Sequence, residues 1–473
     1  MKYIFILFYL PLALYAQYEW SEPVQLSLTG AFPEITYLYP SVAVDNNGTI
    51  HAFWVKGIEY ETLTWYSQIE YRKSIDGGKT WSPTENLTPD YNFYRIYEIQ
   101  AVCDSKNNVH LFYLRGNSPC KVLYKKYDGS TWSEPYEIYP YATIKLRTGI
   151  DKNDRIYLTW YSGTAYYTYC DTADTDPVWN TALKISNENI GVNSFFVFDE
   201  NDNLYSVGRT VNPQYPYFFK YDKLLNQWSK EKMFNISAGG EALAISNDNC
   251  FYANISTGPT NDSNINYETS MALNDSVWSG LNYINSNNNW DYRRLFIDKK
   301  NNLHLFETHF GDIKTSLIYS KKQDGIWSTN SIQADSIYNY AYFNVDYKKD
   351  ERFYIVYDKM TSEFTQIMFQ TKQIDTSIEN DGDEVVKDFD LYQNYPNPFN
   401  SETLIQFNID KSTQVKLDIY NSKGELVRNL ISDRLNKGKH TVNFDASELN
   451  SGIYFFKLVA DKAFETKKML LLR

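Results

Sequence analysis

Cysteine is scarce in this sequence. The 473 residues contain four, Cys103, Cys120, Cys170 and Cys250, and no two of them form a CxxC pair. Four cysteines are too few for a disulfide scaffold in a chain of this length, and their spacing matches no zinc site. The sequence therefore predicts no metal centre and no cofactor, and we expect the cysteines to lie mostly as isolated residues in strands.

Basic residues are outnumbered by acidic ones. The chain has 46 Lys and Arg residues against 58 Asp and Glu residues, a formal net charge of −12, and the cations are scattered along the sequence. A chain without a basic stripe is poorly suited to nucleic acid or to an anionic membrane as its main partner. We therefore expect neither.

Long apolar runs are absent after the N-terminus. The first residues, MKYIFILFYLPLALYAQ, combine one lysine, an apolar run and a small residue at Ala16. This order is typical of a secretory signal peptide, residues 1–16, cleaved before Gln17. The run is too short to span a bilayer comfortably, and an uncleaved anchor is the alternative. No cysteine follows it to carry a lipid, so we expect a mature chain without a transmembrane segment.

Two markers recur in phase along the first three quarters of the chain. Tryptophan recurs at Trp20, Trp81, Trp132, Trp179, Trp228, Trp278 and Trp327, and five of the six intervals are between 47 and 51 residues. An apolar stretch that ends in aspartate and a polar turn recurs at Asp45, Asp104, Asp151, Asp199, Asp298 and Asp346. A period of this length indicates a repeat architecture, and the period-two alternation after each turn predicts β-strands.

Each repeat is predicted to hold four antiparallel strands, so that residues 18–373 form an all-β, seven-bladed β-propeller. A lone four-stranded sheet cannot bury both faces, whereas a ring of sheets buries each one against its neighbours. The last unit, from about Tyr338, has three strands, and the strand at Trp20 is expected to complete it and close the ring. Six or eight blades are the alternatives.

The stretch SIDGGKTW places Ser74, Asp76, Gly78, Thr80 and Trp81 in the pattern S-x-D-x-G-x-T-W. Asp-Gly is a strong hairpin signal, because glycine allows positive φ and the carboxylate accepts hydrogen bonds from turn amides. The pattern resembles the Asp-box, or BNR repeat, of the sialidase-superfamily propellers. The resemblance implies a structural turn on the face away from the ligand pocket.

A sialidase of this kind would need three arginines to hold the substrate carboxylate, because a guanidinium pairs with it through two hydrogen bonds. The string nearest to the family's first arginine motif is FYRIYE, in which Arg95 lacks the following proline. Arg147 and the Arg293-Arg294 pair begin first strands of later units and are expected to point toward the central axis. The alternative is that each arginine pairs with a nearby carboxylate such as Glu98.

Other ligand-contact candidates fall near loops at the same end of the strands: Trp290, Asp291, Glu307 and His309. Exposed aromatic rings can stack on sugars, and a glycosidase needs two carboxylates across the scissile bond. The sequence cannot pair carboxylates from different units, so no catalytic residue is assigned. His51, His110 and His304 recur at one repeat position, which indicates strand packing rather than a metal site.

The chain changes character after Gln373. Residues 374–388 are acidic and poor in apolar residues, which is typical of a linker. Residues 389–473 show short alternating stretches separated by turns, which predicts a small Ig-like antiparallel β-sandwich. This tail contains YPNPFN at 395–400, FDASELNSGIYFF at 444–456 and a Lys-Lys-Met end.

These motifs closely resemble the type A C-terminal sorting domain of the type IX secretion system. The matching positions are Pro396, Asn397, Pro398, Phe399, Gly452, Tyr454, Lys467 and Lys468. The resemblance implies a Bacteroidetes-type bacterium, passage across the outer membrane by the secretion machinery, removal of the tail and frequent attachment to surface glycolipid. A generic carbohydrate-binding sandwich is the alternative.

Two classes of function follow from the sequence. The first is a secreted or cell-surface propeller that binds extracellular glycans or surface proteins without turnover. The second is a divergent sialidase, or another glycoside hydrolase or lyase, that acts at the axial pocket. No catalytic motif is complete in the sequence, so binding is favoured.

Overall fold

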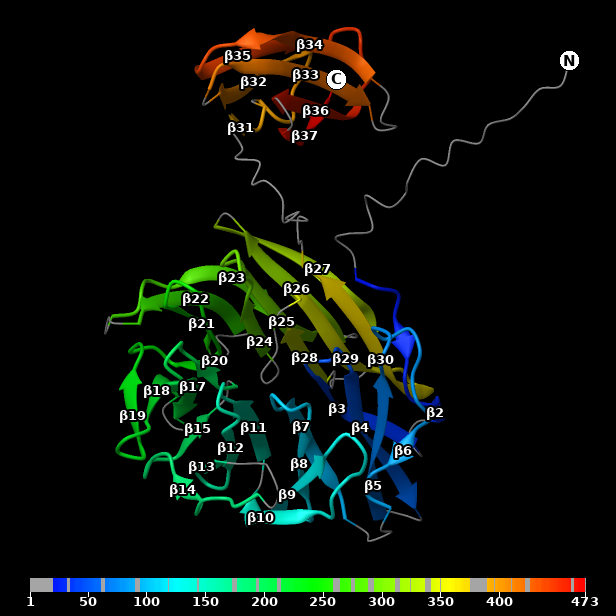
Figure 1. Cartoon of the computed structure of the whole chain (residues 1–473), viewed down its shortest axis with the longest axis vertical. Helices are drawn as coiled ribbons and strands as arrows, with labels where there is room; N and C mark the ends of the chain where they lie inside the picture. Colours follow the sequence, from blue (N-terminus) through cyan, green and yellow to red (C-terminus); the bar gives the residue numbers. More distant parts are fainter. Residues whose placement is uncertain are drawn as a thin grey trace, which may run out of the picture. The chain divides into compact units, whose positions relative to one another are not determined.

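The computed structural model of the chain is built from β-strands throughout the residues that it describes (Figure 1). These are residues 20–31, 35–60, 64–89, 94–117, 119–142, 144–171, 177–192, 195–210, 214–257, 264–273, 277–287, 293–310, 315–323, 325–336, 342–348, 350–374, 389–394, 396–409, 411–421, 426–460 and 463–472. The predicted signal peptide and nearly all of the predicted linker lie outside them. The chain divides into two compact units, Met1–Asp375 and Thr376–Arg473. None of the described segments forms a helix long and apolar enough to cross a membrane.

In the described part of the first unit the strands form seven antiparallel sheets, numbered in chain order. Sheet 1 contains β3 (Ile35–Val44), β4 (Ile50–Tyr60), β5 (Thr64–Ser74) and β6 (Glu85–Asn86). Sheet 2 contains β7 (Ile96–Cys103), β8 (Val109–Arg115), β9 (Cys120–Tyr127) and β10 (Tyr136–Ala142). Sheet 3 contains β11 (Ile144–Ile150), β12 (Ile156–Tyr161), β13 (Ala165–Cys170) and β14 (Leu183–Lys184).

The remaining sheets repeat this plan with small additions. Sheet 4 contains β15 (Ile190–Val192), β16 (Val197–Phe198), β17 (Leu204–Thr210), β18 (Pro216–Asp222) and β19 (Gln227–Lys232). Sheet 5 contains β20 (Ala238–Ile245), β21 (Cys250–Thr257), β22 (Asn264–Ala272) and β23 (Asn282–Asn287). Sheet 6 contains β24 (Arg293–Ile297), β25 (Leu303–Phe310), β26 (Thr315–Gln323) and β27 (Ile326–Ser336). Sheet 7 contains β28 (Phe343–Lys348), β29 (Arg352–Met360), β30 (Phe364–Gln373), β1 (Val24–Gln25) and β2 (Gly30–Ala31).

The second strand of a sheet is deeply buried. In β8 the six residues Val109–Leu114 are all buried, whereas the outermost strand β10 has one buried residue among seven. Adjacent sheets cover both faces of an inner strand, which therefore carries a continuous apolar run instead of an alternating one. The fully buried side chains of Trp54, Phe112 and Trp160 all come from second strands. The prediction of an all-β fold made of antiparallel four-stranded sheets is confirmed.

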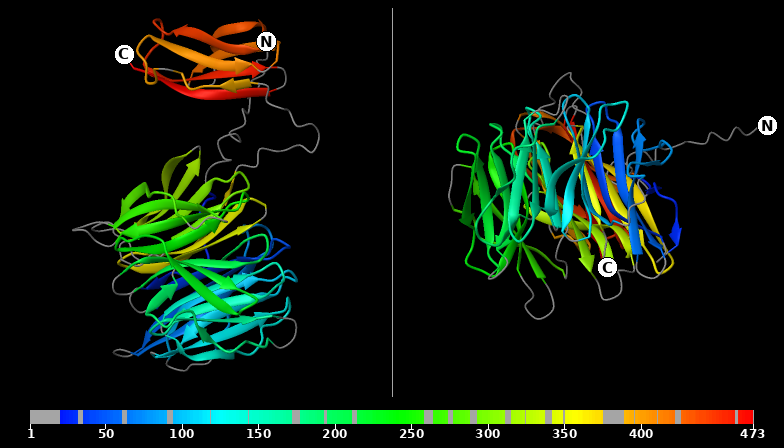
Figure 2. Two further views of the ribbon diagram at one scale, coloured as in Figure 1. Left: turned by 90° about the vertical axis from the view of Figure 1, so that its left-hand side faces the viewer. Right: turned by 90° about the horizontal axis from the view of Figure 1, so that it is seen from below.

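The sheets follow one another in chain order, and the last one returns to the first. Each sheet contacts the next along the chain, and β28 and β29 of sheet 7 contact β3 of sheet 1. In Figures 1 and 2 the sheets of the first unit surround a common centre, with their first strands innermost. Among the described strands, the first strand of each sheet therefore lies nearest the middle of this ring.

The N-terminal segment completes sheet 7. Strand β1 pairs antiparallel with β30, with Val24 opposite Phe369. The Trp20 ring packs edge-on against Phe306 and Tyr319 of sheet 6. The prediction that the strand at Trp20 supplies the missing strand of the last unit is confirmed. This pairing ties the two ends of the unit together.

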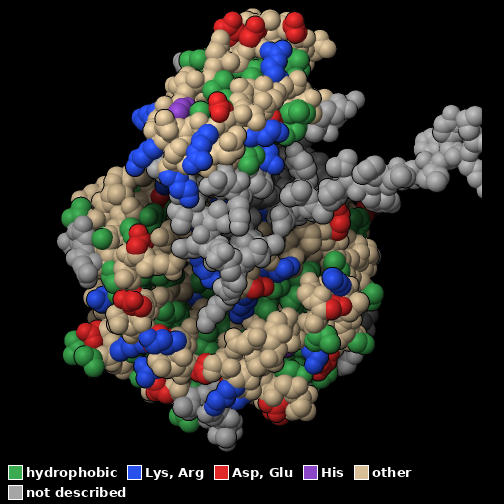
Figure 3. Space-filling model, turned by 45° about the horizontal axis from the view of Figure 1, so that its top comes forward, with side chains coloured by type: hydrophobic (Ala, Val, Ile, Leu, Met, Phe, Trp, Pro, Cys, Tyr) green, Lys and Arg blue, Asp and Glu red, His purple; other side chains and the backbone are tan. Residues whose placement is uncertain are grey.

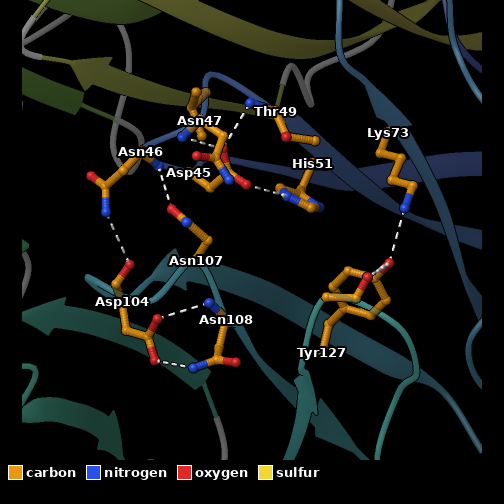
Figure 4. A network of polar contacts seen from close by, with 12 residues as sticks. Asp45, Asn46, Asn47, Thr49, His51, Lys73, Asp104, Asn107, Asn108 and Tyr127 are labelled. Atoms are coloured by element: carbon orange, nitrogen blue, oxygen red, sulfur yellow. Dashed lines mark hydrogen bonds and ion pairs between the residues drawn. The ribbon is translucent and has the colours of Figure 1, made fainter.

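The repeated aspartates close the turns between first and second strands (Figure 4). Asp104 Oδ1 accepts hydrogen bonds from the N–H groups of Lys106 at 3.0 Å and Asn108 at 2.7 Å. The same pair of bonds forms at Asp45, Asp151, Asp199 and Asp298. One turn residue per sheet has positive φ: Gly48, Asn107, Asp154, Asp202, Asn249, Asn301 and Glu351. Glycine, Asn and Asp adopt this conformation most readily, which explains the polar composition of the turns.

The same turns also join neighbouring sheets. The N–H of Asn46 donates to Asn107 Oδ1 at 2.9 Å, and the N–H of Ser105 donates to Asp154 Oδ1 at 2.8 Å. Equivalent bonds run from Lys152 to Asp202, from Asn247 to Asn301 and from Lys299 to Glu351. A polar residue with positive φ thus shapes its own turn and also holds the preceding sheet.

The recurring histidines lie at the beginning of the second strands, next to these turns. His110 Nε2 donates to Asp104 Oδ2 at 3.2 Å, and His110 Nδ1 accepts from the Tyr124 hydroxyl at 2.8 Å. Burial lowers the pKa of His110, and the opposing effect of Asp104 does not restore it. The ring is therefore neutral near pH 7 and its tautomer is fixed by its two partners. His51 and His304 hydrogen-bond in the same way to Tyr71 and Tyr319.

The SIDGGKTW stretch forms a closed turn between β5 and β6. Asp76 accepts hydrogen bonds from the hydroxyl of Thr80 at 2.5 Å and from its N–H at 2.9 Å, and these bonds lower the pKa of Asp76 to about 2. Trp81 Nε1 donates to the Gly78 carbonyl at 3.0 Å. The Trp81 ring packs edge-on against Phe369, 5.0 Å between centroids. The turn therefore fixes a tryptophan that holds sheet 1 to sheet 7.

We expect Gly78→Ala to lower the free energy of unfolding by about 2 to 3 kcal/mol, because it combines backbone strain with overpacking. Gly78 has a φ of +91°, and a Cβ there would lie 2.2 Å from the Phe369 ring. Gly77→Ala is the matched control, because Gly77 also has positive φ, +76°, but has open space around its Cβ position. Urea unfolding measures both variants, and equal losses would show that the contact with Phe369 is unimportant.

The second unit contains two antiparallel sheets around one core. The first has the order β31 (Phe389–Leu391), β32 (Glu402–Ile409), β35 (Gly438–Asp445). The second has the order β34 (Leu426–Leu435), β33 (Thr413–Asn421), β36 (Gly452–Ala460), β37 (Ala463–Leu471). Alternate residues of β32 are buried, and they join Leu417 and Phe456 in a single hydrophobic cluster. Each sheet thus buries one face against the other.

The YPNPFN segment docks on the last strand of this unit. Phe399 is buried, its N–H donates to the Leu470 carbonyl at 2.9 Å, and its carbonyl accepts from the Leu472 N–H at 2.9 Å. Asn397 Oδ1 accepts the Leu470 N–H at 2.9 Å. Of the other motif positions, Pro396 and Pro398 are exposed, Gly452 opens β36, Tyr454 is buried and Lys467 is half-buried, while the Lys468 side chain lies outside the described part. The two distant motifs of the tail therefore meet in one folded unit.

Candidate functional site

Bulges shape the beginning of the first strands. In β3, β7 and β11 the register shifts at Tyr39, Glu98 and Lys145, which stand six residues before the turn aspartate of their repeat. These residues have φ values of 51°, 38° and 64°. A bulge inserts one unpaired residue and changes the direction of the side chains next to it. The side chains at the bulges and just after them line a pocket.

We call this the central pocket, because six of the seven sheets contribute to it from the beginning of the first strand or from the residues just before it. Its lining residues are Tyr39, Pro40, Glu98, Ile99, Gln100, Arg147, Phe195, Arg293, Arg294, Tyr342, Phe343 and Asn344. Five of them occupy one register position, four residues before the turn aspartate of their repeat or its equivalent: Gln100, Arg147, Phe195, Arg294 and Tyr342. The repeat thus brings an equivalent side chain from each of five sheets into the same space.

Two of the three arginines at this pocket lie beside carboxylates. Arg147 Nη1 lies 3.7 Å from Glu98 Oε2, and the same Glu98 oxygen accepts the Leu146 N–H at 2.5 Å. Arg293 Nε lies 3.6 Å from Glu307 Oε2, and the Glu307 side chain is fully buried. The expected alternative of pairing with Glu98 therefore applies to Arg147.

Arg294 differs from the other two arginines. Its guanidinium lies over the Phe195 ring, and none of the described carboxylates is within ion-pair distance of it. Burial and the like charge of Arg147 lower the pKa of Arg294 well below its usual value, and Asp346 opposes this shift. An arginine remains charged at neutral pH even so. The pocket thus contains a charged guanidinium, that of Arg294, with no carboxylate within ion-pair distance among the described residues.

The free space in the central pocket is about 30 Å³. Roughly two water molecules occupy such a volume, so a carboxylate or sulfate group fits while a sugar ring stays at the mouth. Elsewhere on the face seen in Figure 3, Lys and Arg side chains are interspersed with Asp and Glu side chains. Selectivity for an anion would therefore come from the pocket and not from a broad positive surface.

Two tyrosines form one wall of the pocket, and a buried carboxyl supports one of them. The Tyr39 and Tyr342 rings lie 4.4 Å apart, and burial raises the pKa of Tyr39. Behind them, Asp358 Oδ1 accepts the Tyr342 N–H at 2.7 Å, and burial raises the pKa of Asp358 well above its usual value. The Tyr39 hydroxyl is therefore neutral near pH 7.

The structure places the predicted site residues at different locations. Arg147 and Arg293 meet at the central pocket, whereas Arg95 is exposed in the segment before β7 and does not line it. Glu307 is not among the lining residues, and its Oε2 lies 3.6 Å from Arg293 Nε. Trp290 and Asp291 lie outside the described residues, and His309 belongs to β25 with its side chain outside the description. In sheet 1, Ser74 pairs with Ile50 beside the Asp45 turn, so the SIDGGKTW turn lies at the end of the strands opposite the pocket.

Sequence reasoning missed several residues of the pocket: Tyr39, Gln100, Phe195, Tyr342 and Asn344. The signal that finds most of them is the distance from the turn aspartate, because equivalent residues of a repeat point the same way. Residue type alone does not find them, since glutamine, phenylalanine and tyrosine are common in strands that carry no function.

Comparison with known proteins supports the division into two units. Residues 393–472 match the family described as secretion system C-terminal sorting domain. No curated protein sequence matches the chain. Proteins with this sorting domain are delivered by the type IX secretion system, so the chain interacts with that machinery.

Solved structures similar to this chain are distant in sequence. An ulvan lyase, described as bound to -[GlcA(1-4)Rha3S]-, aligns with a TM-score of 0.51 at 12% identity, over 73% of this chain and 95% of the lyase. A protein of unknown function from Dyadobacter fermentans aligns with a TM-score of 0.48 at 10% identity, over 76% of this chain and all of that one. An intramolecular trans-sialidase from Ruminococcus gnavus aligns with a TM-score of 0.39 at 12% identity, over 73% of this chain and 96% of that one.

At such low identity the lyase establishes similarity of fold only. Together with the ring of antiparallel sheets, it identifies the first unit as a β-propeller. The chain therefore consists of a β-propeller followed by a type IX secretion sorting domain, and it is exported to the cell surface or the extracellular space.

Proposed function

We propose that this chain is an exported β-propeller that binds the acid group of an extracellular anionic glycan in its central pocket, without turnover. The observation that carries the proposal is Arg294, a charged guanidinium among the lining residues that has no carboxylate partner in the described part of the chain. A carboxylate or sulfate ester supplies the missing charge, and charge-assisted bonds to guanidinium are among the strongest polar contacts in proteins.

The architecture that supports this site is a seven-bladed propeller at residues 18–373. On this view each of the seven sheets is one blade, and residues 389–473 are an Ig-like sandwich that serves export and is then removed. The central pocket lies in the middle of such a ring, where side chains from different blades meet. Neutral hydrogen-bond donors and acceptors, Gln100 and Asn344, stand beside the arginines and suit the hydroxyl groups of a sugar.

Binding is favoured over hydrolysis because a glycosidase needs two carboxylates at the scissile bond, about 5 to 9.5 Å apart. Glu98 is the one carboxylate among the described lining residues, and it already lies beside Arg147 and bonds the Leu146 N–H. The second candidate function is a divergent sialidase, or another glycoside hydrolase or lyase, and the convergence of three arginines is the feature that favours it.

We expect Arg294→Gln to weaken binding of an acidic glycan by about a hundredfold, because a desolvated charge pair is lost. The exported protein is first screened against immobilised neutral, uronate-containing, sialylated and sulfated glycans. Isothermal titration with an acidic glycan that binds then compares the variant with the wild type. Arg352→Gln is the matched control, because Arg352 lies at the turn end of β29 beside Asp350.

The same samples test the second candidate. A fluorogenic sialoside reports sialidase activity, and unsaturated products report lyase activity on uronate-containing polysaccharides. If the wild type turns over a substrate and Arg294→Gln does not, the proposal of binding without turnover is rejected, and the central pocket is a catalytic site. Failure to bind every acidic glycan, or equal binding of acidic and neutral glycans, would refute the anion site.

A further inference from the structure

A second pocket lies over sheet 2, about 460 Å³ in volume. We call it the outer pocket, and its polar and aromatic lining consists of Tyr94, Arg115, Asn117, Lys121 and Glu137. Its volume is within the range of small-molecule sites in proteins, about 300 to 1,000 Å³. The outer pocket therefore has room for a sugar ring, which the space inside the central pocket does not offer.

The outer pocket opens at the same end of the strands as the central pocket. Ile96 pairs with Arg115, and Arg115 pairs with Lys121, so the start of β7 and the β8–β9 loop lie together. The Gly116 N–H donates to the Arg95 carbonyl at 3.0 Å and fixes the segment before β7 to this loop. Tyr94 of the outer pocket is four residues from Glu98 of the central pocket, at most about 14 Å along an extended strand.

The chemistry of the outer pocket suits a sugar. The Tyr94 ring is 47% exposed, so its face is available for stacking against the C–H face of a pyranose. The Arg115 guanidinium lies 6.0 Å from the centre of this ring, and Lys121 and Glu137 form an exposed ion pair at 2.5 Å. The Arg115 and Lys121 side chains can donate hydrogen bonds to the hydroxyl or acid groups of a sugar, and Glu137 can accept them.

The outer pocket is lined partly by residues of restricted conformation. These are Pro119, Pro135 and Pro140, whose φ angles are fixed by their rings. Gly116 adopts a φ of +144°, and a Cβ there would lie 3.2 Å from the Cys120 Cα, so a larger residue is disfavoured at this position. A preformed site loses less conformational entropy when a ligand binds, which raises affinity.

From these observations we propose that the outer pocket is a second glycan subsite, and that the ligand is an oligosaccharide that extends radially over sheet 2 from an acid group held at the central pocket. This inference rests on the proposed function, because it takes the central pocket as the site that binds the acid group of the ligand. One sugar ring cannot occupy both pockets, because the stretch from Tyr94 to Glu98 separates them. The protein should therefore select by chain length as well as by charge.

The test measures affinity against the length of the ligand. Free glucuronate and a ladder of oligosaccharides of alternating glucuronate and sulfated rhamnose, from disaccharide to octasaccharide, are titrated into the exported protein by calorimetry. We expect the affinity to rise with length until both pockets are filled. We expect Tyr94→Ala to reduce the affinity for the longer oligosaccharides about tenfold and to leave the affinity for glucuronate unchanged, because one aromatic contact is removed. Tyr283→Ala is the matched control, another exposed tyrosine, on β23 of sheet 5.

The outcomes separate this inference from the proposed function. If Arg294→Gln abolishes binding while affinity is independent of length, or Tyr94→Ala has no effect on the longest oligosaccharide, the outer subsite is wrong and the central anion site stands. If neither glucuronate nor any oligosaccharide of the ladder binds the wild type, both proposals fail for this class of glycan. A length-dependent gain that Tyr94→Ala removes and Tyr283→Ala retains supports the outer subsite.

Discussion

Deletion of residues 389–473 is expected to abolish delivery of the protein to the cell surface and to leave the propeller in the periplasm. The deleted segment carries the sorting motifs, and residues 393–472 match the sorting domain family. Among the described residues, the hydrophobic cluster of this segment runs from Phe389 to Leu471 and includes none from the seven sheets of the first unit. Immunoblots of periplasmic, outer-membrane and medium fractions, with protease accessibility on intact cells, measure the location.

The control for this deletion is a substitution that leaves the sorting domain folded. Lys437→Ser changes an exposed residue between β34 and β35 and should be exported normally. The truncated protein in the periplasmic fraction should keep the β-sheet circular dichroism and the melting transition of the propeller. Surface delivery of the truncated chain at the wild-type level would contradict the role of the tail.

Asp104→Ala is expected to lower the free energy of unfolding by about 3 to 5 kcal/mol, the cost of removing one partner from a buried charged network. The Asp104 carboxylate is 4% exposed and bonds the N–H groups of Lys106 and Asn108 together with the His110 ring. The Asn108 side-chain amide also donates to Asp104 Oδ2, at 2.6 Å (Figure 4), and alanine leaves all of these donors without their acceptor. Chemical denaturation of the purified protein measures the loss.

Asp104→Asn is the matched variant and should cost less than half as much. The asparagine oxygen still accepts the two turn N–H groups, and the neutral His110 ring can switch tautomer to accept from the new amide. The chain itself tolerates a neutral residue at this place, since Ser246 occupies the equivalent position in sheet 5 and its hydroxyl bonds the Cys250 N–H. Equal losses for Ala and Asn would show that the charge, and not the hydrogen-bond geometry, holds the turn.

Acid should weaken the same turn in two stages. Burial lowers the pKa of His110 in the folded chain below its usual value of 6.5. As the pH falls, His110 therefore takes up a proton in the unfolded chain before it does so in the folded chain. The free energy of unfolding should begin to fall as the pH drops below about 6.5. Burial raises the pKa of Asp104, but hydrogen bonds from His110 and Asn108 outweigh it and bring the pKa to about 2. The contribution of this carboxylate is therefore complete above about pH 4 and is lost between pH 4 and pH 2. In Asp104→Asn the second stage should be smaller.

Local signals in the sequence predicted much of the fold. The aspartate turns follow from carboxylate caps and from positive φ at glycine, asparagine and aspartate, which are properties of a few adjacent residues. The strands follow from alternation and from the near-constant spacing of tryptophans. The pairing of the Trp20 strand with β30 was predictable because the last repeat lacks a strand and an unpaired edge is costly.

The candidate site was predictable only in part. Arg147 and Arg293 were found because arginine is unusual at the beginning of a strand directed to the middle of a ring. Gln100, Phe195 and Tyr342 were missed because their residue types carry no chemical signal, although their distance from the turn aspartate is the same. Arg95 looked like part of a motif, yet it precedes β7 and lies exposed, away from the central pocket.

By itself, the sequence determined the repeat, the type of turn, the closure of the ring and the export route, because each depends on neighbouring residues or on a motif that is read locally. The tertiary structure alone decided which side chains from different repeats share one space. It paired Arg147 with Glu98 and Arg293 with Glu307, and it left Arg294 over Phe195 without a described carboxylate. Such groupings depend on distances between strands that are far apart in the chain, and the electrostatic energy of a charge depends on those distances and on its burial.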